Sequence, residues 1–128
     1  LKEHMDLPLI YNLSHYLTSW FKEVKQSGSY YIAHWLGHAA DREYHERVNQ
    51  KQDVSMIHIG AVRECLEGYG AKGELSPEAR TNELSEMIVT VLYGIDVRFC
   101  MTNGEIDLDA WVELLVNQIK TTLGPYMK

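Results

Sequence analysis

The stretch that decides the fold is residues 84–101, LSEMIVTVLYGIDVRFCM. Its apolar residues recur at the three- and four-residue spacing of an α-helix, but they form two stripes instead of one. The first stripe is Leu84, Met87, Ile88, Val91, Ile95 and Phe99, and the second is Val89, Leu92, Tyr93, Val97 and Cys100. Because a helix that is apolar on two sides must be buried on two sides, we predict that one side faces the domain core and the other faces a partner.

The last predicted helix, residues 108–123, carries a similar excess of apolar side chains. Asp107 is its expected N-cap, and Gly124-Pro125 is expected to end it. We predict that the last two helices of each chain form a homodimer interface, an isologous four-helix bundle. The interface residues we expect are Val89, Leu92, Val97, Cys100, Trp111, Leu115 and Ile119. The alternative is a five-helix monomer whose own helices surround residues 84–101.

Helical spacing also dominates the rest of the chain, and alternating strand patterns are absent. Helices are expected at about 7–25 and 30–40, with the break at Ser27-Gly28-Ser29. A third helix should reach about Gly68, followed by a glycine-rich turn, and the fourth should begin with Ser76 as N-cap and Pro77 in its first turn. The prediction is an all-α domain of five or six helices.

Composition limits the class of protein. The chain has 128 residues, 45% hydrophobic and 23% charged, which fits one globular domain. A net charge of −6 argues against a free-standing nucleic-acid binder. There is no apolar run long enough to span a membrane and no signal peptide, and free thiols at Cys65 and Cys100 are expected, so we predict a cytoplasmic protein. The first residue is leucine, which suggests that a longer protein has been trimmed.

A mixture of aromatic and polar side chains predicts a small-molecule site within the bundle, since ligand sites are mostly apolar with a few polar groups. Each residue alone would more often be a packing residue, and only their convergence favours a ligand site. Arg98 could pair with an acidic ligand or with Asp96 across a dimer, or extend to water. The predicted ligand-binding residues are Tyr16, Trp20, Tyr31, Trp35, His38, His58, Met87 and Tyr93.

Metal binding and catalysis receive less support from the sequence. His34 and His38 are four residues apart and share a helix face, and His58 or His45 could supply a third ligand to a metal or haem. No cysteine or carboxylate stands at ligand spacing in the same segment, so we expect no metal and no cofactor. No nucleophile motif, dinucleotide fingerprint or phosphate-binding loop occurs, and we expect that the protein is not an enzyme.

Residues 67–123 resemble the C-terminal half of tetracycline-repressor-type (TetR family) transcription regulators. The resemblance begins with a turn in which Gly68 or Gly70 precedes Gly73-Glu74-Leu75, followed by a long helix with Gly94 near its middle. It ends with the acidic turn Asp107-Leu108-Asp109 before a terminal amphipathic helix. The first 60 residues match the family only in the order and length of helices.

The resemblance implies an all-helical domain that dimerises through its last two long helices and binds a small effector inside the bundle. In the family, effector binding changes the spacing of two N-terminal helix-turn-helix domains and releases DNA. These 128 residues contain no helix-turn-helix segment. The chain therefore resembles the sensing and dimerising half of a transcriptional repressor that binds DNA through another domain. The alternatives are a helical metal- or haem-binding protein using His34 and His38, and a protein-interaction module.

Overall fold

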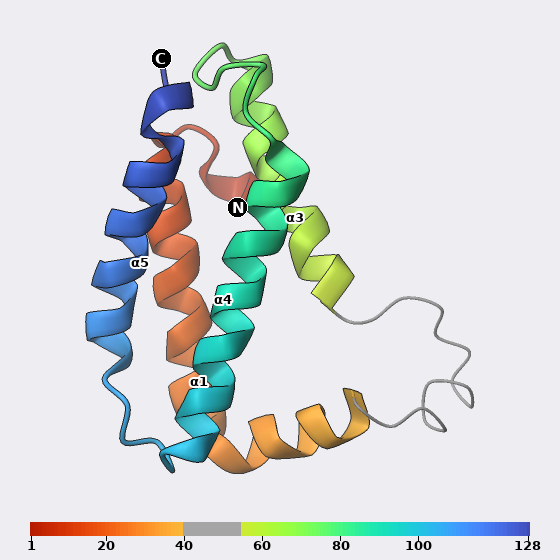
Figure 1. The fold of residues 1–128 in the computed structure, drawn as a ribbon, viewed down its shortest axis with the longest axis vertical. Helices are drawn as coiled ribbons and strands as arrows, with labels where there is room; N and C mark the ends of the chain where they lie inside the picture. The colour runs from red at the N-terminus through yellow and green to blue at the C-terminus, as the bar shows by residue number, and fades with distance from the viewer. Residues whose placement is uncertain (40–54) are drawn as a thin grey trace.

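The computed structural model describes the backbone of residues 1–39 and 55–128, and all side chains in these ranges except those at 27, 29–39 and 55. In the described part of the chain there are four α-helices and no strands (Figure 1). They are α1 (Leu9–Ala39), α3 (Ser55–Ala71), α4 (Thr81–Met101) and α5 (Leu108–Leu123), with short 3-10 helices at Lys2–His4 and Gly124–Tyr126. The all-α prediction is confirmed.

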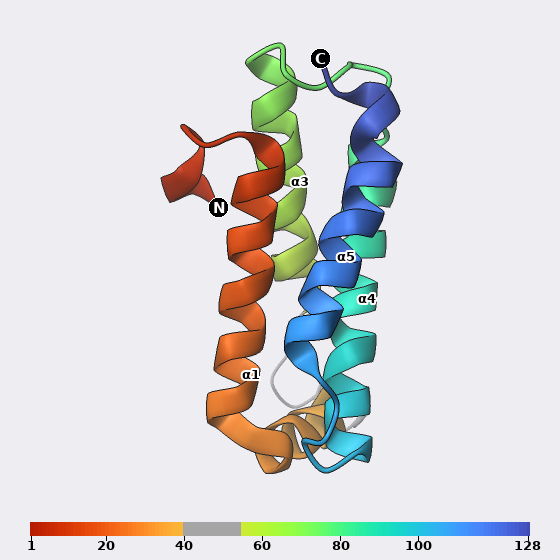
Figure 2. The ribbon, with the colours of Figure 1, turned by 90° about the vertical axis from the view of Figure 1, so that its left-hand side faces the viewer.

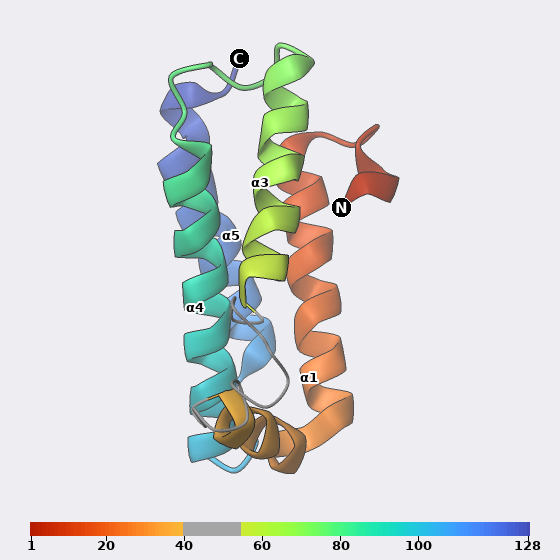
Figure 3. The same cartoon turned by 90° about the vertical axis from the view of Figure 1, so that its right-hand side faces the viewer.

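The four helices form two layers. Figures 2 and 3 show α1 and α3 in one layer and α4 and α5 in the other. The backbone of α4 approaches both α3 and α1, and that of α5 approaches α1. The core between the layers is lined by buried leucine, isoleucine, valine and aromatic side chains from all four helices. None of the described helices is both long and apolar enough to cross a membrane.

The predicted break after residue 25 is confirmed at one residue, Gly28. Its φ of 76° and ψ of 170° lie in a region that is essentially restricted to glycine. The helix resumes directly after Gly28, so the two predicted helices form one kinked element, α1. In Figure 1 the part of α1 beyond the kink turns away and crosses the lower end of the bundle toward the side where α3 lies.

The junctions around α3 and α4 differ from the prediction. Gly68 and Gly70 lie inside α3, and of the three glycines only Gly73 has a positive φ and forms the turn. A Cβ at Gly68 would lie 2.6 Å from the Met5 methyl group, the end of a flexible side chain that would have to shift. Ser76 does not cap α4; its hydroxyl oxygen accepts a hydrogen bond from the Glu78 amide in a separate turn, and α4 begins at Thr81.

Buried polar groups fasten residues 1–7 to the bundle. The side-chain amide of Asn12, a fully buried residue, donates hydrogen bonds to the Leu1 carbonyl at 3.0 Å and to the Tyr69 hydroxyl at 3.2 Å. The Tyr69 hydroxyl in turn donates to the Leu7 carbonyl at 2.5 Å. These bonds join the N-terminal segment to both α1 and α3.

The start and end of α5 agree with the sequence prediction. The Asp107 carboxylate accepts a hydrogen bond from the Ala110 amide at 3.1 Å and caps the first turn, so a donor that lacks an intrahelical partner is satisfied. The helix ends at Leu123, directly before Gly124-Pro125. Cys65 is a buried free thiol, and Cys100 is half-buried. Burial raises the pKa of the Cys65 thiol to about 11.

Candidate functional site

A cluster of aromatic rings lies where α1, α3 and α4 meet. Trp20 of α1 is at its centre, with ring centroids 4.7 Å from His58 of α3 and 5.6 Å from Tyr93 of α4. His58 and Tyr93 are 6.0 Å apart, and the Tyr16 ring is 6.0 Å from Trp20. All four residues were predicted to bind a ligand, and the fold brings them together. We call these four residues and Asp96 the aromatic–Asp96 cluster.

Asp96 is the polar member that joins the two layers. Its two carboxyl oxygens both lie 3.1 Å from the indole Nε1 of Trp20, which donates to them. Asp96 is only 6% exposed. Burial raises the pKa of its carboxyl group from 3.8 to about 7, and the hydrogen bond from Trp20 opposes this shift only in part. The charged form of Asp96 is therefore disfavoured in the folded protein.

The other titratable groups in the cluster are also shifted by burial. Burial lowers the pKa of His58, although the Glu23 carboxylate opposes the change, so the imidazole tends to be neutral. Burial raises the pKa of Tyr16 to about 12, and Glu23 adds to this shift. The Tyr16 hydroxyl oxygen is buried and has no hydrogen-bond partner among the described residues.

The remaining predicted ligand-binding residues do not join this cluster. Met87 is wrong as a member, because it precedes Asp96 by nine helical positions and therefore lies on the opposite side of α4. The Met87 side chain is 37% exposed. The side chains of Tyr31, Trp35 and His38 lie outside the described residues, as does that of His34, and so does the whole of His45. Among the described residues, no three metal-ligating side chains lie close enough together to hold a metal ion.

The predicted dimer residues divide into two groups. One group is buried within the chain's own core and has no surface to offer a second chain, so it is wrong as an interface: Val89, Leu92, Leu115 and Ile119. The other group, Val97, Cys100 and Trp111, is half-buried. The reason is that residues of both predicted stripes of α4 are buried within one subunit, where the backbone of α4 approaches both α1 and α3.

Asp96 is a site residue that was not predicted from the sequence. It was expected only as a partner for Arg98 across a dimer, but Arg98 is exposed and its guanidinium lies 6.0 Å from the centre of the Trp111 ring of α5. A signal was available in the spacing. Asp96 is four residues after Leu92 and three before Phe99, which places an acid on the buried side of α4.

Comparison of the chain with protein-family models, with curated proteins and with solved structures found no match.

The raised pKa of Asp96 predicts how stability depends on pH. Between about pH 4 and pH 7 the folded protein keeps the proton that the unfolded chain releases, so the unfolding free energy should fall as pH rises through this window. For a shift of this size the loss is on the order of 2–4 kcal/mol. Urea unfolding of the wild type and of Asp96→Asn at several pH values measures it, and the asparagine variant should lack the decline.

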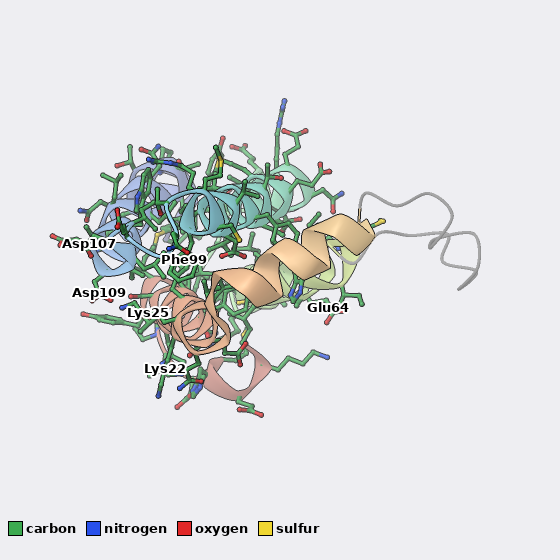
Figure 4. The ribbon with its side chains drawn as sticks, turned by 90° about the horizontal axis from the view of Figure 1, so that it is seen from below. Lys22, Lys25, Glu64, Phe99, Asp107 and Asp109 are labelled. Carbon is green, nitrogen blue, oxygen red and sulfur yellow. The ribbon has the colours of Figure 1, made fainter. Side chains whose placement is uncertain are left out.

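Asp109→Asn is the matched control. The Asp109 side chain is 87% exposed and pairs with Lys25 at the α1–α5 edge, away from α3 (Figure 4). This variant should keep the wild-type decline. His58 contributes in the opposite direction, since its lowered pKa makes stability rise with pH, but it is present in all three proteins and cancels in the comparison. Parallel pH profiles for wild type and Asp96→Asn would contradict the assignment.

Proposed function

We propose that this chain is the effector-sensing and dimerising domain of a TetR-type transcription regulator, with the aromatic–Asp96 cluster as the sensing centre. The observation that carries the proposal is the hydrogen bond between Trp20 and Asp96 at the meeting point of three helices. A ligand at this point touches both layers of the bundle at once. The resemblance of residues 67–123 to the family supports the same assignment.

The mechanism we propose is a population shift. A ligand that binds one arrangement of α1, α3 and α4 more tightly than another biases the domain toward it, by no more than the difference in affinity. Trp20 precedes Gly28 on α1, so a shift at Trp20 would be passed along the same helix to the kink. In the complete regulator, such a change would alter the spacing of helix-turn-helix domains that lie outside these 128 residues, and DNA would be released in the cytoplasm.

A surface shared by α4 and α5 is the face we propose for dimerisation. The guanidinium of Arg98 on α4 lies 6.0 Å from the centre of the Trp111 ring on α5, so side chains of the two helices meet at this surface. Met87, Val91 and Gly94 lie on the same side of α4 as Arg98, since they precede it by eleven, seven and four residues. Leu114 follows Trp111 by one helical turn and is 57% exposed. This α4–α5 face replaces the buried residues of the sequence prediction as the proposed interface.

The sensing function predicts that a small molecule stabilises the folded chain through Trp20. In a thermal-shift screen of a chemically mixed library, a ligand at a hundredfold excess over its Kd should raise the midpoint by roughly 10 °C. The shift should be strongly reduced in Trp20→Phe, which loses the hydrogen bond to Asp96, and unchanged in Trp111→Phe. A library that yields no stabilising ligand, or ligands that act equally on both variants, would reject the sensing centre.

The dimer prediction has its own measurement. Sedimentation velocity at micromolar concentration should give twice the chain mass of 14.8 kDa. Leu114→Lys places a charge on the α4–α5 face and should give a monomer. Ile57→Lys is the control, because Ile57 is 72% exposed on α3, away from that face. A monomeric wild type, or a dimer that Ile57→Lys disrupts and Leu114→Lys does not, would refute the proposed face.

A further inference from the structure

The aromatic–Asp96 cluster has a buried acid but no positively charged partner for it among the described residues. Within the described residues, no Lys, Arg or His forms an ion pair with the Asp96 carboxylate, although Asp96 is buried. Its hydrogen bonds there both come from the neutral indole of Trp20. A second carboxylate, that of Glu23, acts on Tyr16 and His58 through its charge. The site therefore combines one buried acid with neutral aromatic rings, and the exposed Glu23 carboxylate adds negative charge nearby.

A buried carboxyl group in such surroundings can remain protonated or gain a cation. Burying an ionised carboxylate without a positive partner costs much free energy. The carboxyl group retains free lone pairs, since one N–H is shared between its two oxygens. His58 could supply the charge, but burial disfavours its protonated form. The positive partner is thus missing from the described part of the chain.

The rings around Asp96 suit a cation of a particular kind. The faces of tryptophan and tyrosine attract organic ammonium groups through their π electrons, while a hard inorganic cation prefers several oxygen ligands. Trp20 and Tyr93 are tilted by 48° to each other and His58 stands nearly perpendicular to both, so the rings present faces in different directions. The buried Tyr16 hydroxyl adds an oxygen acceptor without a partner among the described residues.

We infer that the ligand of this cluster is an organic cation, a protonated or quaternary amine with an apolar body, whose positive charge pairs with Asp96 while its carbon atoms contact Trp20 and Tyr93. The inference rests on the proposed sensing function and names the ligand class of the same site. Binding would replace the proton on Asp96 by the charge of the ligand. Burying the Asp96 carboxylate without a positive partner costs free energy, and pairing with the ligand cation would offset this cost only in the bound state.

Three probes of nearly the same size separate charge from shape: benzyltrimethylammonium, its uncharged isostere neopentylbenzene, and the anion phenylacetate. Isothermal titration at pH 8 should show binding of the cation, with the neutral isostere and the anion each at least roughly tenfold weaker, the discrimination expected of a desolvated charge pair with cation–π contact. Asp96→Asn should bind the cation roughly tenfold more weakly and the neutral probe about as well as the wild type. Asparagine can still accept the Trp20 hydrogen bond, so this variant is expected to fold.

Asp109→Asn removes the same charge from an exposed position on α5 and should bind all probes like the wild type. The cation inference is overturned if benzyltrimethylammonium binds no better than neopentylbenzene, or equally well to wild type and Asp96→Asn. If a neutral or anionic probe binds instead and loses its binding in Trp20→Phe, the sensing function stands and only the ligand class is wrong. If none of the probes binds, the cation inference fails, and the sensing function fails with it only when the mixed library also gives no ligand.

Discussion

The hydrogen bond from the Trp20 indole to the Asp96 carboxyl group is the interaction on which the rest of the structure depends. It joins α1 of one layer to α4 of the other, across 76 positions in the sequence. Apolar side chains around it supply most of the burial, but their contacts are not directional and allow helices to slide. A bonded polar pair within that contact fixes one relative position of the two helices. His58 of α3 packs against the same indole, so the third helix is positioned by the same pair.

This arrangement carries a cost that a purely structural core would avoid. An apolar residue at position 96 could pack between the layers without bearing a charge, and replacing a buried ionic group by an apolar one is often neutral or stabilising. At Asp96, burial instead raises the pKa of the carboxyl group to about 7, within the physiological range. Perturbed acids of this kind gather at functional sites, because the same burial that destabilises the charge makes a bound partner valuable. Trp20 of the cluster and the kink at Gly28 lie on one helix, which gives a ligand at Trp20 a direct mechanical route to the rest of α1.

Local signals in the sequence predicted the helices well, and the contacts between helices less well. The two ends of α5 were predicted correctly from Asp107 and Gly124, because capping depends on a few neighbouring residues. Ser76-Pro77 was predicted to start a helix but forms a separate turn, since serine and proline are favoured both at helix starts and in turns. Tyr16, Trp20, His58 and Tyr93, four of the residues predicted to bind a ligand, lie together in the structure. The roles of Val89 and Leu92 were wrong because an apolar stripe does not state whether its own chain or another one covers it.

The most direct test of this account is an NMR pH titration that follows the Asp96 carboxyl carbon and the Trp20 indole N–H together. The account predicts that the carboxyl resonance titrates with a midpoint near pH 7, in line with a pKa of about 7, and that the indole resonance shifts with the same midpoint because it donates to that group. A carboxyl midpoint near the ordinary value of 3.8, or an indole resonance that does not follow it, would contradict the central claim that a buried acid bonded to Trp20 joins the two layers.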